Sequence, residues 1–383
     1  MKRYILIVAA VALATVSCSR NYDVNPSGEG TAIGFGTWTD VLTKAARVTG
    51  NDNKAFANGE SFDVFGYKTV GTTDHSVFNG DDVTATVDGT TVTWDYATHR
   101  FWDPAAASYT FFAVLPSGNL KDETTGGYDL AGKFVSNDIV FDDPTAFSND
   151  VLIADKTVKA GTGSAAPYSY TEKVNLKFNH AATCVDLKVK QDKELGDAVV
   201  KVTALSLLNI HNKGHFTVSG YASSEPFTPT IDWAEATTPT TLGTSGVYEI
   251  LKASDAADDV TVAGKSEYKD DHSINTTTDT PATLFENYVF MPQGITAGTQ
   301  KIRISYTIQV GSEEPNVYEN VEFDIRDFMQ TDTDNNGGTN ITSWDKSTHY
   351  IYFIAIGANV IEFTAEVKNW ATTDVNGYHY LLN

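Results

Sequence analysis

The chain has few cysteines, few basic residues and little helical periodicity. Of its two cysteines, Cys18 lies in a leader-like segment, so no intramolecular disulfide is expected in the mature protein. This excludes a disulfide scaffold and any metal site that needs several thiolates. The net charge of −22 argues against nucleic-acid binding, because a phosphate backbone repels such a surface.

The first residues have the pattern of a bacterial export signal. Lys2 and Arg3 precede an apolar run over residues 4–14, which is shorter than the about 20 residues needed to cross a bilayer. Cys18 follows small residues, as in a bacterial lipobox, where the cysteine thiol is diacylated. We therefore expect residues 1–17 to be a lipoprotein signal peptide and Cys18 to carry the lipid. A plain secretory signal with an incidental cysteine is the alternative.

Most of the chain after Thr31 alternates bulky with small or polar residues, which is typical of β-strands with one buried face. Asp88-Gly89 between two such runs predicts a hairpin, because both residues tolerate the backbone of a tight turn. Many short strands separated by turn residues favour an all-β fold of antiparallel β-sandwiches, with helices only minor.

The length of 383 residues is typical of two domains. A strand ending in Trp94 leads to residues 109–116, and a strand ending in Trp233 leads to the similar residues 288–292. This short internal repeat favours two related domains. Glycine and proline near residues 160–171 indicate a linker. We expect one domain over 48–169 and the other over 170–383, with a boundary near 192–196 as the alternative.

The sequence contains none of the common motifs for serine hydrolases, nucleotide binding or zinc proteases. His211 and His215 would lie about 13 Å apart on a strand, too far to share a metal ion unaided. Residues 332–337 match the first half of a calcium loop, but Ser343 stands where a bidentate Glu is needed. Cys184 is expected to be a small buried hydrophobe. We predict a protein that is not an enzyme and has no metal or cofactor.

Short segments spread along the chain carry a family resemblance. They are Ile33-Gly34-Phe35, Ala46-Arg47, and residues 56–67, 109–116, 150–154, 176–181, 289–292 and 350–370. In their order and spacing they resemble the fimbrillin family of Bacteroidales surface lipoproteins, the subunits of proteolytically assembled pili. The resemblance implies two transthyretin-like antiparallel β-sandwich domains in tandem.

The resemblance also implies processing. An Arg-specific, trypsin-like protease would cut the Arg47–Val48 bond after the lipoprotein reaches the outer membrane. Residues 18–47 would then be the lipid tether and a propeptide strand, with Ile33, Phe35 and Trp38 on that strand. Loss of the strand would expose an apolar groove and unpaired backbone groups, which a strand from another subunit can fill.

The expected donor is the tail after residue 370. Tyr378, Tyr380 and Leu382 would share one face of an extended strand; the alternative is a last strand of the tail's own domain. The resulting prediction is a shaft-type subunit of a surface pilus, polymerised with copies of itself or related subunits. The alternatives are an uncleaved anchor or accessory fimbrial lipoprotein, and a glycan-binding surface lipoprotein that stacks sugars on tryptophans such as Trp102 and Trp344.

Overall fold

The computed structural model describes fifteen stretches of the chain. These are residues 31–37, 58–88, 91–118, 120–121, 134–136, 138–141, 150–159, 173–192, 195–219, 230–235, 247–251, 273–274, 281–330, 339–357 and 361–369. Within them the structure is built from strands with very little helix, such as the short 3-10 helix η3 (Ile325–Asp327), which confirms the predicted all-β class. None of the helical structure in these stretches is long and apolar enough to cross a membrane.

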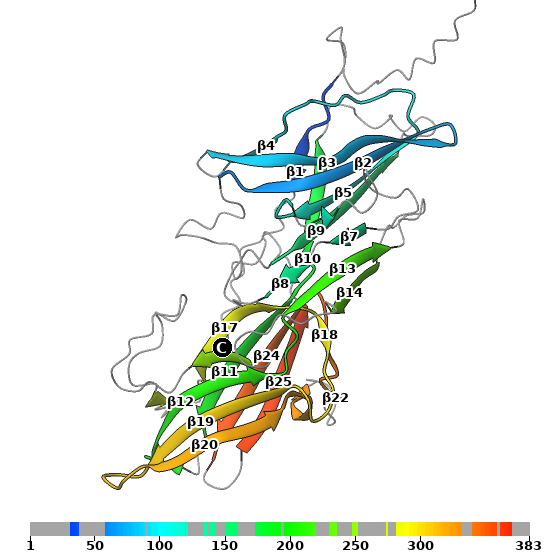
Figure 1. The fold of residues 1–383 in the computed structure, drawn as a ribbon. Coiled ribbons are helices and arrows are strands. Elements are labelled where there is room, and N and C mark those ends of the chain that lie inside the picture. The colour runs from blue at the N-terminus through cyan, green and yellow to red at the C-terminus, as the bar shows by residue number, and fades with distance from the viewer. Residues whose placement is uncertain are drawn as a thin grey trace, which may run out of the picture.

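The strands form four principal sheets, arranged along an elongated molecule (Figure 1). The first sheet has seven strands and lies at one end. In spatial order they are β1 (Phe35–Thr37), β10 (Val174–His180), β9 (Leu152–Lys159), β5 (Ser108–Leu115), β2 (Ser61–Val70), β3 (Thr73–Asp88) and β4 (Thr91–Asp95). One face of this sheet encloses a core rich in aromatic residues, which includes Phe62, Phe78 and Phe111.

A smaller second sheet packs on the other face of the first. It consists of β14 (Thr230–Glu235), β13 (Lys213–Ser219), β7 (Phe134–Ser136), β6 (Leu120–Lys121) and β8 (Ile139–Val140). Phe65 and Phe112 of the first sheet share a buried cluster there with Phe216 of β13. The first sheet is therefore covered on both faces, which explains the nearly continuous apolar run of β5.

The third and fourth sheets form a sandwich at the opposite end (Figure 1). The third contains β17 (Ala282–Phe290), β11 (Thr183–Gln191), β24 (Thr348–Ile356), β25 (Ile361–Asn369), β21 (Met329–Gln330) and β22 (Thr339–Asn340). The fourth contains β15 (Val247–Leu251), β12 (Val199–Leu208), β19 (Lys301–Gln309) and β20 (Asn316–Asp324), with β16 (Ser273–Ile274) also paired to β12. A two-stranded ribbon of β18 (Gln293–Gly294) and β23 (Ser343–Trp344) completes the fold.

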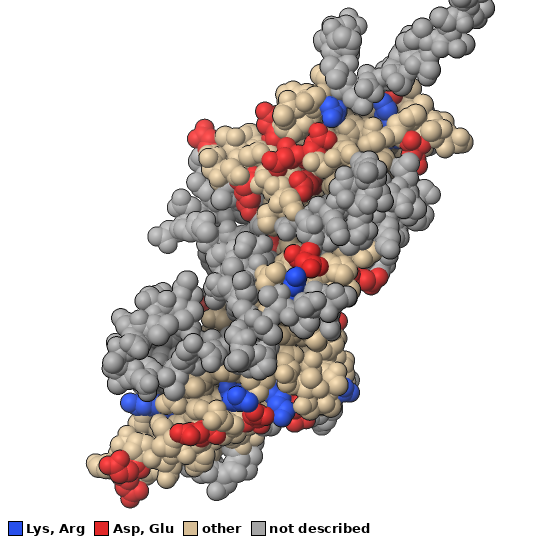
Figure 2. Space-filling model, in the orientation of Figure 1, with Lys and Arg blue, Asp and Glu red and all other residues tan. Residues whose placement is uncertain are grey.

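Strand β19 shows why the sequence folds in this way. Its residues alternate strictly: every second residue from Ile302 to Ile308 is buried against the third sheet, and the residues in the alternate positions are half-exposed. On the outer side, Glu322 of β20 bonds both Lys301 and Arg303, and these contacts lower the pKa of its carboxyl group. Figure 2 shows this mixture of acidic and basic side chains around β19 and β20.

The pairing confirms the predicted hairpin and adds one feature that the sequence did not indicate. β3 and β4 pair antiparallel up to Asp88 and Thr91, so Asp88, which was expected in the turn, is instead the last paired residue of β3. Three pairs are parallel instead: β1 with β10, β11 with β24, and β21 with β25. The expected boundary at residue 170 lies outside the described residues and stays a prediction; β10, just after it, belongs to the first sheet.

A buried hydrogen bond joins two large side chains in the core of the sandwich. Trp344 Nε1 donates to the hydroxyl of Tyr352 at 2.7 Å, and both side chains are almost fully buried. Burial raises the pKa of the Tyr352 hydroxyl far above its ordinary value. Since the indole N–H can only donate, it depends on this acceptor.

We expect Tyr352→Phe to lower the free energy of unfolding by about 1–3 kcal/mol, because it leaves the Trp344 N–H buried without a partner. The measurement is urea denaturation followed by tryptophan fluorescence. Tyr318→Phe is the matched control: its ring stacks on Tyr306 at 4.7 Å, its hydroxyl bonds no other described residue, and a change within about 0.5 kcal/mol is expected. Equal stabilities for the two variants would contradict the prediction.

Candidate assembly site at the opening strand

The first described segment, residues 31–37, lies in a slot at the margin of the first sheet. On one side β1 pairs in parallel with β10, with Phe35 opposite Val174. On the other side Ala32 forms an antiparallel bridge with Phe101. The segment is thus held by backbone pairing to two parts of the chain that lie far from it in sequence.

Backbone hydrogen bonds fix the position of this segment within the slot. Ile33 N donates to Arg100 O at 2.8 Å, and Trp102 N donates to Thr31 O at 3.2 Å. Further along, Val174 N donates to Gly34 O at 2.8 Å. Each bond satisfies a main-chain group that would otherwise face solvent or an apolar core without a partner.

Two side chains of the segment belong to the core of the first sheet. Ile33 and Phe35 are each only 1% exposed. The Phe35 ring lies within 6 Å, centre to centre, of four aromatic rings, mostly edge-on, the geometry that aromatic pairs prefer. These rings are Phe62, Phe78, Tyr96 and Phe111. Burial of each side chain stabilises the fold by about 1.5–3 kcal/mol.

Tyr96 links the aromatic core to the backbone of the segment. Its hydroxyl donates to the carbonyl oxygen of Ile33 at 2.6 Å and accepts a hydrogen bond from Arg100 N at 3.1 Å. Burial raises the pKa of Tyr96 to about 12, so the hydroxyl remains a donor. Any strand that replaced residues 31–37 would have to offer a carbonyl at this point.

The two glycines of the segment lie on its outer side. A Cβ at Gly36 would lie 2.5 Å from Asn175 Oδ1, and one at Gly34 would lie 3.5 Å from Lys173 Cγ. A larger residue at Gly36 would therefore have to displace the Asn175 side chain, whereas one at Gly34 would make only ordinary contact; Ile33 and Phe35 face inward. The sequence pattern indicated the inward side chains, but the contact of Gly36 with Asn175 became apparent only from the position of β10.

Of the residues predicted for assembly, Ile33 and Phe35 lie together in this slot. Cys18, Trp38, Arg47 and the tail residues Tyr378, Tyr380 and Leu382 lie outside the described residues, as does the acidic segment 332–337. Sequence reasoning missed Tyr96 and residues 100–102, which form one wall of the slot. No local signal marks them, because their role depends on a partner more than 60 residues away.

The tryptophans considered for sugar binding do not form an exposed platform in the described part of the chain. Trp94, Trp102 and Trp344 are buried in the cores. Trp233 is half-buried, and its indole N–H donates to Ala181 O at 2.8 Å. Their packing explains their presence without a carbohydrate ligand.

Comparison with known proteins gives matches over most of the chain. Residues 46–370 match the family model described as fimbrillin-like. A fimbrial protein from Bacteroides vulgatus superposes with a TM-score of 0.55 and 21% sequence identity over 89% of this chain and 99% of that protein, which shows a shared fold. The tip fimbrial protein Mfa3 from Porphyromonas gingivalis, with a C-terminal truncation, superposes only loosely, with a TM-score of 0.36 and 12% identity over 82% of this chain and 95% of that one. Curated protein sequences give no significant match.

We expect Phe35→Ala in the uncleaved chain to lower the free energy of unfolding of the first sheet by about 3–5 kcal/mol, because it leaves a cavity among four aromatic rings. Urea denaturation followed by fluorescence measures the change. Thr31→Ala, at an exposed position of the same segment, is the control and should change stability by no more than about 0.5 kcal/mol. An unchanged stability in the Phe35 variant would mean that the segment does not occupy the core in solution.

Proposed function

The chain belongs to the fimbrillin-like family, and on this ground we propose that it is a structural, non-enzymatic subunit of a cell-surface pilus, polymerised by β-strand exchange. Family membership itself supports a pilus-related subunit. The proposal adds that the protein is exported as an outer-membrane lipoprotein acylated at Cys18. An Arg-specific protease then cleaves the Arg47–Val48 bond, and the product becomes a shaft-type subunit.

The observation that carries this proposal is the position of residues 31–37. They precede Arg47 in the sequence, yet they fill both a core position and a backbone slot of the first sheet. Cleavage after Arg47 would separate them, together with the lipid on Cys18, from the rest of the domain. The family match begins at residue 46, and the mature chain would begin at residue 48.

Loss of the opening strand would leave the first sheet incomplete in two respects. The pocket around Phe62, Phe78, Tyr96 and Phe111 would lose its central ring. The backbone groups of β10 and residues 100–102 would lose their partners. An incoming strand that carries apolar side chains at alternate positions restores both, which is the physical basis of strand addition.

The tail after residue 370 suits this role in its residue pattern. Tyr378, Tyr380 and Leu382 alternate, so an extended tail would place all three on one face. Two of them would take the places of Ile33 and Phe35. Because donor and acceptor lie at different parts of the subunit, the contact is head-to-tail and does not close on itself, so it propagates into a filament.

Two alternative functions predict different experimental results. An anchor or accessory fimbrial lipoprotein would keep acylated Cys18 as its first residue, whereas a shaft subunit would begin at Val48. A glycan-binding lipoprotein would lose oligosaccharide binding on Trp102→Ala or Trp344→Ala. The burial of both tryptophans does not favour that class.

We expect Arg47→Ala to abolish assembly, because the opening strand would stay in its slot and the chain would stay attached to its lipid. The measurement is electrophoresis of unheated surface material, for oligomer ladders, with mass spectrometry of the first residue. Lys44→Ala is the matched control: it removes a nearby basic residue but leaves the Arg-specific site, so ladders and Val48 as first residue should persist. Ladders from the Arg47 variant would refute the role of the bond.

We expect deletion of residues 378–383 to leave a folded monomer that is cleaved but cannot extend a filament. Replacing Tyr378, Tyr380 and Leu382 together by Ser should have the same effect, because the donor would lose its buried face. The control replaces His379 and Leu381, on the other face, by Ser and should assemble normally. Filaments of normal length from the triple variant, seen by electron microscopy, would exclude the tail as donor.

A further inference from the structure

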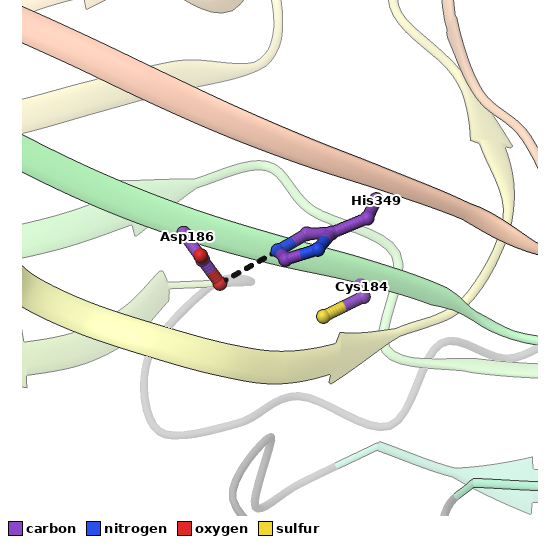
Figure 3. A group of neighbouring side chains, drawn as sticks. All are labelled: Cys184, Asp186 and His349. Atoms are coloured by element: carbon purple, nitrogen blue, oxygen red, sulfur yellow. Dashed lines mark ion pairs between the residues drawn. The ribbon is translucent and has the colours of Figure 1, made fainter. Parts of the chain in front are cut away.

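Cys184, Asp186 and His349 come together on the third sheet, outside the candidate assembly site. β11 and β24 run parallel, and their register places Cys184 directly opposite His349. Asp186 follows two residues after Cys184 on β11, so its side chain lies on the same face. Figure 3 shows the three side chains gathered over β11, with a dashed line between Asp186 and His349.

The potential ligand atoms of these residues are close to one another. One atom from each side chain, the Cys184 sulfur, a carboxylate oxygen and a ring nitrogen, can be chosen so that all three lie within 4.8 Å. His349 Nε2 and Asp186 Oδ1 are 2.9 Å apart. Modest side-chain rotation would bring all three to a single ion at the bond lengths of about 2.0–2.3 Å that zinc sites show.

The hydrogen bonding of the cluster is incomplete. Asp186 Oδ1 already accepts a hydrogen bond from Asn287 N at 2.7 Å, at a bulge where β17 pairs with β11. Nε2 of His349 is buried and, although close to Oδ1, is not aligned with it as a hydrogen bond. The nitrogen is therefore held by an ion pair with Asp186 but by no hydrogen bond, and a metal ion shared by the two side chains would satisfy both.

The surroundings of Cys184 favour a cation. The side chain is completely buried, and burial, together with the negative charges of Asp186 and Asp150, raises the pKa of its thiol well above the usual value. A divalent ion would reverse this effect, because it offsets the carboxylate charge and stabilises the thiolate, with release of one proton.

We propose that Cys184, Asp186 and His349 form a binding site for one divalent transition-metal ion of the zinc class. The set of thiolate, carboxylate and neutral imidazole suits this class and does not suit calcium or magnesium, which prefer oxygen ligands. Three protein ligands leave the fourth position of a tetrahedral site for a water molecule. Of the three side chains, that of His349 is the most exposed, so we place the solvent side of the site there.

The site would stiffen the junction between the first sheet and the third. Ser347 N donates to Ala182 O at 2.9 Å, and Thr183 Oγ1 donates to Thr348 O at 3.0 Å, immediately beside the three ligands. Cys184 also belongs to the buried cluster that contains Phe112 and Phe216 of the first two sheets. An ion bound only by the folded chain would raise the stability of this junction in proportion to its affinity.

The test uses the full chain with Cys18→Ser, so that Cys184 is its only thiol. Addition of Co²⁺ under reducing conditions should produce a sulfur-to-cobalt charge-transfer band that saturates at one equivalent. Zn²⁺ should remove the band and raise the melting temperature, whereas Ca²⁺ and Mg²⁺ should do neither. Affinity should increase with pH, because the thiol must lose its proton.

Variants of the ligands separate this site from adventitious binding. Cys184→Ala should abolish the charge-transfer band. Asp186→Asn or His349→Gln should each weaken zinc binding by at least about 10–100-fold, because even the loss of a residue that only hydrogen-bonds to a metal ligand weakens binding by that factor. His99→Gln is the control, because His99 contacts Asp95 at 2.8 Å with neither a cysteine nor heavy burial nearby.

Two results would overturn the proposal. One is the absence of a charge-transfer band in folded, fully reduced protein. The other is zinc affinity that is the same in the His349→Gln chain as in the parent. If the Cys184→Ala chain does not fold, His349→Gln decides the question, since its side chain lies at the solvent side of the cluster. Pilus assembly can fail or succeed independently of either result.

Discussion

The burial of Phe35 among four aromatic rings is the interaction on which the first sheet depends. The residue is supplied by a strand at the margin of the sheet, and the covalent connection of that strand to the rest of the domain runs through the segment that contains Arg47. When an edge strand completes a core, the core is closed while the strand is bound. If the strand is removed, an apolar groove and unpaired backbone groups are exposed. Under the proposed cleavage, the same contacts would keep the subunit monomeric before the cut and would bind a strand of a neighbouring subunit after it. We therefore propose that assembly is controlled by whether residues 31–47 remain covalently joined to the rest of the chain.

The sequence predicted the parts of this arrangement that depend on local pattern. Alternation in residues 32–38 indicated that Ile33 and Phe35 face one side, and Asp88-Gly89 indicated the hairpin of β3 and β4. The two-residue strands, such as β6 and β18, could not be predicted, because such short pairings have no period to detect. Parallel pairing of β1 with β10 was also invisible, since register between distant segments is decided by the packing of the whole sheet.

The cluster of Cys184, Asp186 and His349 could not be predicted from the sequence for a different reason. The sequence led us to expect a small buried hydrophobe and no metal site, and Cys184 is indeed buried. Cys184 and Asp186 have a spacing found in any strand, and His349 is more than 160 residues away. Only the parallel register of β11 and β24 makes them neighbours. A ligand set assembled across two strands has no motif, so its chemistry can be recognised only after the strands are placed.

The short connection between β10 and β11 has a mechanical consequence. Only Ala181 and Ala182 separate β10, the neighbour of the opening strand, from β11, a central strand of the other sandwich. From β11, pairing continues through β24 to β25, the last strand before the tail. In a filament of the proposed kind, tension entering at the slot would run along β10 into β11 and leave through β25. Strands pulled along their length share the load over many hydrogen bonds at once, so this route would resist shear instead of opening bond by bond.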